Sequence, residues 1–151
     1  MERNGYWIKT EQKNGEISPE FRKTHTLRGA VKKATATVTA MGVYHLYVNG
    51  VKAGDAVMAP YWTSYQNRVQ EQSYDITDLL QEENVFGILL GKGWAMGRIG
   101  YSNQRHFTGY FAENLSLIAN IRVEYADGSV EEIGTDESWQ VFSSQILDSE
   151  I

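Results

Sequence analysis

This 151-residue chain contains no cysteine, only two prolines and no long run of apolar residues. Without cysteine there is neither a disulfide framework nor a thiolate metal site, so redox chemistry does not indicate a compartment. No apolar stretch approaches the ~20 residues that a membrane-spanning helix needs. The N-terminal residues 1–5 also lack the apolar core of a signal peptide. We therefore expect a soluble protein with no membrane partner, and a cytoplasmic location is favoured.

Basic residues are also in short supply. The chain has 14 Lys and Arg residues against 19 Asp and Glu residues, which gives a net charge of −5. This balance disfavours nucleic acid as a partner. A chain of this length can bury a core without disulfides, and we expect residues 1–151 to form one domain.

Patterns typical of β-strands recur along most of the chain. Residues 43–48 alternate so that Tyr44, Leu46 and Val48 share one face and His45 lies on the other. The following Asn49-Gly50 favours a type I′ hairpin turn. Asp127-Gly128 gives a second hairpin signal. The other expected strands cover residues 33–40, 68–74, 84–90, 115–125, 130–133 and 139–142.

Two segments refine this pattern. Residues 84–90 form a continuous apolar run, as expected of a strand that is buried on both faces. Residues 75–81 are the one helical candidate, in which Asp75 or Thr77 could cap a turn or two. Many short strands with frequent turn signals predict an all-β fold, a β-sandwich or jelly roll with at most one short helix.

The common catalytic and cofactor motifs are absent or weak. His25, His45 and His106 lack partners at metal-ligand spacing, so we expect no metal site. The glycines in residues 91–97 are spaced wrongly for a dinucleotide-binding turn, and bulky Trp94 stands where the backbone should approach a phosphate. There is no Gly-x-Ser-x-Gly elbow. We therefore expect no cofactor and no catalytic residue in this chain.

Neighbouring carboxylates occur several times, but always beside turn signals. Glycoside hydrolysis needs two carboxyl groups that face each other across a cleft, and sequence neighbours do not show such an arrangement. We interpret these carboxylates as capping and turn residues. They are Asp75 and Asp78, Glu82 and Glu83, and Asp136 and Glu137.

Large aromatic residues are concentrated in segments that look like loops. Sugar rings stack on Trp and Tyr faces, and polar neighbours such as Arg98 can bind their hydroxyl groups. Packing against the sandwich or against a neighbouring domain is the alternative for each ring. Trp7 and Trp139 lie in strand-like segments and are expected in the core. The candidate contact residues for carbohydrate or a partner domain are Tyr61, Trp62, Tyr65, Trp94, Arg98 and Tyr101, with Trp94 expected near the first three.

A series of motifs also comes in the order seen in one known family. Together they resemble the N-terminal β-sandwich domain of bacterial α-L-rhamnosidases, glycoside hydrolase family 78. The resemblance covers essentially the whole chain, although residues 101–114 match poorly. The motifs are Phe21-Arg-Lys, residues 36–40, Gly42-Val-Tyr-His-Leu-Tyr-Val-Asn-Gly50, Ala59-Pro-Tyr-Trp-Thr-Ser-Tyr65, Arg68-Val69, Tyr74-Asp-Ile-Thr-Asp-Leu-Leu80, Asn84-Val85, Gly91-Lys-Gly-Trp94, Tyr125-Ala-Asp-Gly-Ser129 and Gly134-Thr-Asp-Glu-Ser-Trp139.

This resemblance implies a jelly roll of galactose-binding-like type within a larger multidomain glycosidase. The general acid and base would belong to a separate α/α-barrel domain that inverts at rhamnose. The implied partners are that barrel, neighbouring β domains of the same chain, and rhamnose-containing glycans. Some related jelly rolls hold a structural calcium ion in a loop. Two hypotheses stay open: a structural module that packs beside the barrel and borders its cleft, and an autonomous carbohydrate-binding module.

Overall fold

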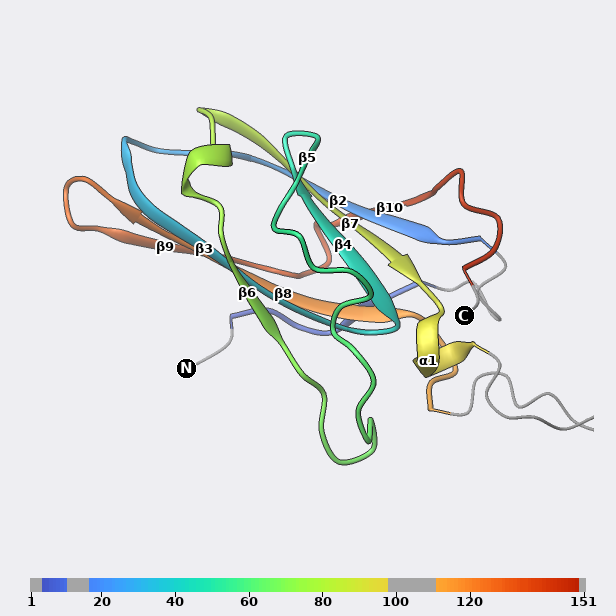
Figure 1. The fold of residues 1–151 in the computed structure, drawn as a ribbon. Helices are drawn as coiled ribbons and strands as arrows, with labels where there is room; N and C mark the ends of the chain where they lie inside the picture. The colour runs from blue at the N-terminus through green and yellow to red at the C-terminus, as the bar shows by residue number, and fades with distance from the viewer. Residues whose placement is uncertain (1–3, 11–16, 98–110, 150–151) are drawn as a thin grey trace, which may run out of the picture.

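Two antiparallel β-sheets lie face to face in the computed structural model, which describes residues 4–10, 17–97 and 111–149 (Figure 1). The first sheet has the order β1-β8-β3-β6, with β9 paired to β8, and the second has the order β10-β2-β7-β4-β5. In the first sheet the strands are β1 (Ile8–Lys9), β3 (Val31–Met41), β6 (Gln72–Asp75), β8 (Ser116–Tyr125) and β9 (Val130–Gly134). In the second they are β2 (Pro19–Thr26), β4 (Val43–Val48), β5 (Val51–Lys52), β7 (Glu83–Gly91) and β10 (Gln140–Ser143).

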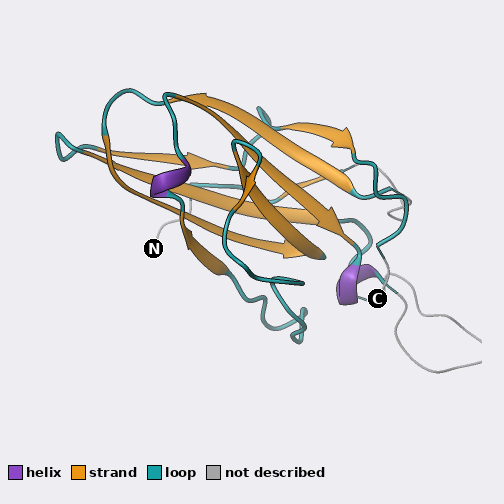
Figure 2. Ribbon diagram, turned by 45° about the horizontal axis from the view of Figure 1, so that its top comes forward, coloured by secondary structure: helices purple, strands orange, loops and turns teal. Residues whose placement is uncertain are grey.

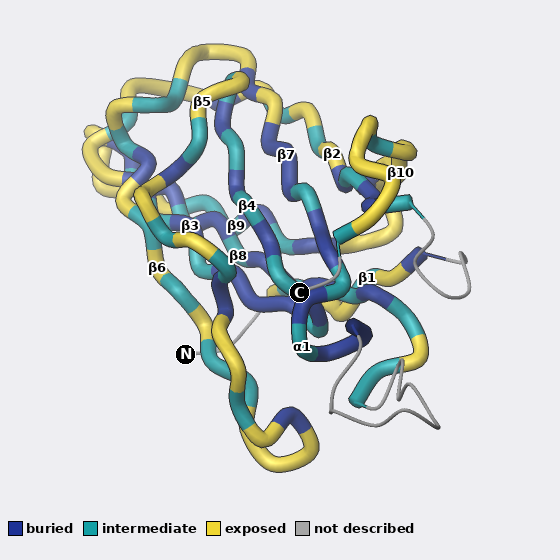
Figure 3. The backbone as a smooth tube through the Cα atoms, turned by 45° about the vertical axis from the view of Figure 1, so that its right-hand side comes forward, coloured by how far each residue is buried: buried dark blue, intermediate teal, exposed yellow. Residues whose placement is uncertain are grey.

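The core lies between the sheets because alternate residues of each strand point inward. On β3 and β8 the register pairs Ala36 with Ile121 and Val38 with Ala119, and all four side chains are buried. Figure 3 shows these buried stretches between more exposed loops. The second sheet contributes larger inward side chains, including Phe21, Leu46, Phe86 and Ile88, which are 0 to 2% exposed.

The predicted β-sandwich is confirmed, and most of its strands lie where the sequence places them. The expected strand over 68–74 is wrong in its first half, because β6 begins at Gln72. The expected helix at 75–81 is a single 3₁₀ turn, η1 (Thr77–Leu79), and a second short helix, α1 (Gly93–Met96), was not predicted. These two turns lie at opposite ends of the sandwich (Figure 2).

Strand β2 was missed because its sequence looks polar on both faces. Its inward positions pass from Phe21, which is fully buried, to Lys23 and His25, which are only partly buried. Lys23 binds Ser138 and lies 3.9 Å from Asp136, so this end of the sandwich closes with polar groups rather than an apolar core. Hydrophobic alternation could not reveal such a strand.

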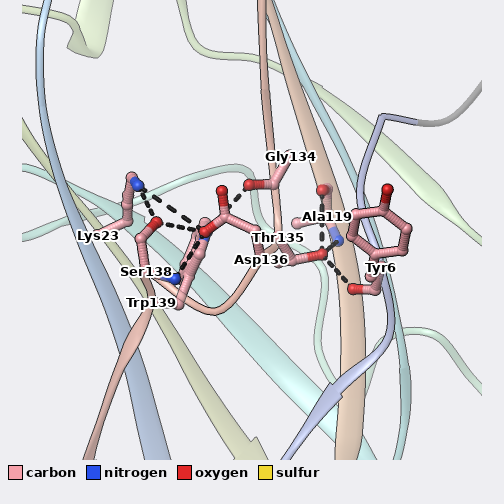
Figure 4. Close-up of polar contacts among 8 residues, drawn as sticks. All are labelled: Tyr6, Lys23, Ala119, Gly134, Thr135, Asp136, Ser138 and Trp139. Atoms are coloured by element: carbon pink, nitrogen blue, oxygen red, sulfur yellow. Dashed lines mark hydrogen bonds and ion pairs between the residues drawn. The ribbon is translucent and has the colours of Figure 1, made fainter.

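Thr135 ties the N-terminal segment to β8. Its buried hydroxyl donates to the Tyr6 carbonyl (2.7 Å) and lies 3.2 Å from the Ala119 nitrogen, which donates to it (Figure 4). The Tyr6 nitrogen donates to the Thr135 carbonyl at 2.8 Å. Trp7, which the sequence places in the core, is nevertheless 45% exposed, whereas Trp139 is buried as predicted. No helix in the described ranges combines the length and hydrophobicity that crossing a bilayer requires.

Candidate functional site

The indole rings of Trp62 and Trp94 stack on each other, which confirms their expected proximity. Their ring centroids lie 6.3 Å apart and the ring planes differ by 14°. Trp62 comes from the loop after β5 and is 56% exposed, while Trp94 comes from α1 and is partly buried. We call this pair the aromatic ledge. Two nearly parallel rings at the surface suit stacking against a sugar ring or against another aromatic side chain.

A tight turn just before Trp62 holds that side of the ledge. The Tyr61 nitrogen donates to the Met58 carbonyl (3.0 Å), and the Tyr44 nitrogen donates to the Ala59 carbonyl (2.8 Å), which fixes the turn to β4. The Ala59–Pro60 peptide bond is cis. Met58 and Tyr61 have positive φ angles of 59° and 71°, a conformation that non-glycine residues seldom adopt unless the surroundings enforce it.

Tyr65 lies beneath this loop instead of on its surface. It is 6% exposed, and its ring centroid is 5.3 Å from that of Phe111, at an interplanar angle of 48°. Its hydroxyl donates to the Tyr61 carbonyl at 3.3 Å, and burial raises its pKa. Phe111 was not singled out in the sequence, where nothing marks it as a partner of Tyr65. In this structure Tyr65 therefore supports the loop that carries Trp62.

Tyr61 lies near a cluster of buried hydroxyl groups, close enough to raise the pKa values of Tyr44 and Tyr74. The buried Tyr44 hydroxyl lies within hydrogen-bond distance of the Gln72 Oε1 (2.9 Å), the Val38 carbonyl (3.1 Å) and the Tyr74 hydroxyl (3.1 Å). Burial raises the pKa of Tyr44 far above its ordinary value, and the nearby Tyr74 and Tyr61 raise it further. The hydrogen bonds of this cluster link Tyr44 to Gln72, Val38 and Tyr74, while Trp62 stacks on Trp94 of α1. The candidates Arg98 and Tyr101 lie outside the described residues, as does His106.

Two of the carboxylates singled out in the sequence, Asp75 and Asp136, serve turns as predicted, whereas Glu83 is the first residue of β7. Asp136 accepts hydrogen bonds from the Ser138 nitrogen (2.9 Å) and from the Ser138 hydroxyl, and Trp139 Nε1 donates to the Gly134 carbonyl at 3.1 Å (Figure 4). These bonds lower the pKa of Asp136. Asp75 is held in the same way by Thr77, again with a lowered pKa. A glycosidase general acid needs the opposite shift.

The two histidines in the described ranges, His25 and His45, lie on strands of the second sheet. His45 lies on the outer face of β4 as predicted, with its ring 6.3 Å from that of Tyr47, and burial followed by the charge of Lys52 lowers its pKa. His25 Nε2 lies 3.3 Å from Glu131 Oε1 at the polar end of the sandwich. Across the part of the chain that the structure describes, no three His, Asp or Glu side chains are grouped so that they could hold a metal ion.

Comparison with known protein families gives a match over most of the chain. Residues 29–151 match the family model described as the alpha-L-rhamnosidase N-terminal domain. Among characterised proteins, an alpha-L-rhamnosidase of Streptomyces avermitilis is 32% identical over 137 residues, and one of Formosa agariphila is 31% identical over 142 residues. These alignments cover 90% and 87% of this chain but only 13% and 15% of the relatives.

Solved structures of a rhamnosidase and of a lectin share the fold of this chain. The rhamnosidase of Aspergillus terreus superposes with a TM-score of 0.90 at 34% identity, over 96% of this chain and 17% of that one. A lectin of Pleurotus ostreatus, solved in complex with GalNAc, superposes with a TM-score of 0.60 at 25% identity, over 99% of this chain and 39% of the lectin. The described fold is therefore shared with a small part of much longer chains.

Proposed function

Because the chain belongs to the α-L-rhamnosidase N-terminal domain family, we propose that it is a non-catalytic accessory domain of a larger α-L-rhamnosidase. The observation that carries this proposal is the small share of each relative that this chain aligns with. Nearly all of this chain aligns with rhamnosidases, yet it accounts for only 13% to 17% of their length. The parent protein would remove terminal α-L-rhamnose, and its catalytic barrel and further β domains would lie elsewhere in the polypeptide.

Three aspartates of the described residues are arranged in a way that supports a non-catalytic role. Asp75, Asp127 and Asp136 all accept hydrogen bonds from a Ser or Thr two residues ahead, which lowers their pKa values. An acid held ionised in this way is a poor proton donor to a glycosidic oxygen at neutral pH. Their hydrogen bonds instead stabilise turns.

The experiment compares three proteins on an aryl α-L-rhamnoside: the 151-residue chain, the parent polypeptide, and the parent lacking residues 1–151. We expect hydrolysis by the parent and none by the 151-residue chain. The shortened parent should retain its catalytic residues but lose stability or bind substrate more weakly. Hydrolysis by the 151-residue chain with a kcat/KM near that of the parent would overturn the proposal.

Sugar binding by the aromatic ledge is a second candidate function. Two observations favour it: the stacking of exposed Trp62 on partly buried Trp94, and the likeness to a lectin that was solved with GalNAc. In this reading a rhamnosyl ring stacks on the open face of Trp62, while the Trp94 ring holds Trp62 in position.

Titration with L-rhamnose and rhamnosyl oligosaccharides tests this candidate through tryptophan fluorescence. Binding should change the emission of the wild-type chain, and Trp62→Ala should abolish the response. Trp7→Ala is the matched control, because Trp7 is also exposed (45%) but is not part of the ledge. A flat titration up to tens of millimolar sugar would exclude sugar binding and leave domain packing as the role of the ledge.

A further inference from the structure

The two outer faces of the sandwich differ in chemistry. On the β3–β8 sheet, alternation turns Thr35, Thr37 and Arg122 outward, and this face is mainly polar. On the central strands of the other sheet, the outward positions include Val43, His45 and Leu89. Polar side chains lie beside them on β2. The β3–β8 sheet thus has a polar outer face, whereas the outer face of the other sheet has apolar side chains at its centre.

A groove of about 220 Å³ opens on this apolar face at its α1 end. Val43, His45 and Leu89 line it from the sheet, Val57 from the loop that leads to the aromatic ledge, and Ile146 from the segment after β10. Val57 is 65% and Ile146 41% exposed. We refer to this feature as the apolar groove.

The apolar side chains around the groove are left open to solvent by the described residues. The apolar run of β7 predicts burial on both faces, but Leu89, the outward β7 side chain that lines the groove, is only partly buried. Val57 and Ile146 are exposed on either side of it. Apolar side chains gathered in a groove at the surface are typical of a site that another domain covers.

The path of the segment after β10 indicates what covers the apolar groove. The Ser18 nitrogen donates to the Ile146 carbonyl (3.0 Å), and the Lys92 nitrogen donates to the Ser149 hydroxyl (3.0 Å). These bonds return the segment after β10 toward α1 (Figure 1). Ser149 therefore lines the groove. Any polypeptide that follows Ser149 in a parent protein would pass beside this groove.

We propose that the apolar groove is the docking site for the domain that follows in the parent polypeptide. That domain would place an aliphatic or aromatic side chain against Val57 and Ile146. This proposal rests on the proposed function, because it requires a longer chain. It also names the face that an accessory domain of this kind uses: the outer side of β4 and β7, next to the aromatic ledge.

The absence of cysteine makes a direct test possible. Val57→Cys places a thiol on the groove. Val130→Cys is the matched control, because Val130 is also exposed (41%) but lies on β9 of the other sheet. Each variant is made in the 151-residue chain and in the parent polypeptide and is treated with a thiol reagent. Peptide mass spectrometry then gives the modification rate of the introduced cysteine alone.

We expect both thiols to react readily in the 151-residue chain. In the parent, V57C should react at least about tenfold more slowly, because reaction then requires transient opening of the interface, while V130C keeps its rate. Equal V57C rates in both proteins would overturn the proposal. So would protection in the 151-residue chain that grows with protein concentration, since that result identifies a second copy as the occupant.

Rhamnosidase assays on the same samples separate the two proposals. A parent that hydrolyses rhamnosides but leaves V57C fully reactive overturns docking at the groove and keeps the proposed function. A parent in which V57C is protected but no rhamnoside is hydrolysed overturns the proposed activity and keeps the docking site.

Discussion

Asn49 Nδ2 donates a hydrogen bond to Asn84 Oδ1 at 2.9 Å, joining the turn of the β4–β5 hairpin to the start of β7. The Asn49 side chain also accepts from the Val85 nitrogen (2.9 Å). Asn49 and Gly50 have φ angles of 52° and 80°, which confirms the two left-handed positions that a type I′ turn requires. The Asn-Gly pair thus shapes the turn and also binds the neighbouring strand.

Replacing Asn84 by alanine tests the importance of this link. Asn84 is 2% exposed, and its Oδ1 also accepts from the Gln81 nitrogen (2.8 Å) while its Nδ2 donates to the Gln81 carbonyl (2.7 Å). Loss of the side chain leaves several buried groups without partners, so the free energy of unfolding should fall by about 2 kcal/mol or more. Urea denaturation followed by circular dichroism measures this change. Asn67→Ala, at an exposed loop position, should change it by less than about 0.5 kcal/mol.

Sequence patterns predicted the strands that obey strict alternation, because burial of one face of a sheet selects period two directly. They failed at β2, where Lys23 and His25 point inward at an end of the sandwich closed by polar groups. They also failed at the N-terminal half of the expected 68–74 strand, where polar residues with strand-like composition belong to a loop. Local composition cannot distinguish an edge strand from an extended loop, since both expose their side chains.

For the candidate site, the residue types could be read from the sequence, but only part of their arrangement could be predicted. The proximity of Trp62 and Trp94 was predicted and is confirmed. The burial of Tyr65 beneath the loop depends on Phe111, a contact between distant segments that no local pattern encodes. The same limit explains Trp7, whose exposure follows from the short β1 strand at the edge of its sheet.

Alanine substitution should lower the free energy of unfolding much more at the buried Trp139 than at the exposed Trp62. Trp139 is 6% exposed and its indole nitrogen is hydrogen-bonded, so W139A should lower the free energy of unfolding by about 3–5 kcal/mol. W62A removes one exposed ring from a stacked pair and should cost only about 1 kcal/mol. Urea denaturation of both variants measures the difference. Equal losses would contradict the assignment of Trp62 to the surface.

The stability of the domain should fall at alkaline pH because of its buried tyrosines. Burial raises the pKa of Tyr44, and also those of Tyr65 and Tyr74, above the ordinary value of 10.0. A group whose pKa is raised by folding stabilises the fold fully below its unfolded pKa, and this contribution is lost as the pH rises through 10 toward the folded value. Each such tyrosine should add a slope of up to about 1.4 kcal/mol per pH unit above that point.

Tyr44→Phe isolates the largest of these contributions. The variant should be less stable than the wild type at pH 8 by about 1–2 kcal/mol, because it loses the hydroxyl bonds to Gln72 and Tyr74. Above pH 10 its unfolding midpoint in urea should fall less steeply with pH than that of the wild type. Tyr6→Phe, at a position that is 74% exposed, should follow the wild-type curve throughout. Parallel slopes for Y44F and the wild type would contradict the assigned burial effect.

Two glycines with positive φ angles should respond very differently to alanine. Gly50 (φ 80°) has no atom within 4 Å of the position of an added Cβ. G50A should therefore lower the free energy of unfolding by only about 1 kcal/mol, because alanine disfavours the left-handed backbone conformation. At Gly42 (φ 140°) the added Cβ would lie 2.5 Å from the Gly91 carbonyl oxygen and 2.8 Å from Leu115 Cδ2. The backbone of β7 must then move, and G42A should lower the free energy of unfolding by more than about 3 kcal/mol.

The position of Gly42 also connects this loss to the aromatic ledge. Only Lys92 separates Gly91 from α1, which carries Trp94, so a displacement of the Gly91 carbonyl should disturb the stacking of Trp94 on Trp62. Near-ultraviolet circular dichroism, which is sensitive to coupled indole rings, should therefore change in G42A and stay unchanged in G50A under conditions where both remain folded. An unchanged spectrum in G42A would show that the ledge is held by the loop turn at Met58–Tyr61 alone, independently of the close packing between β4 and β7.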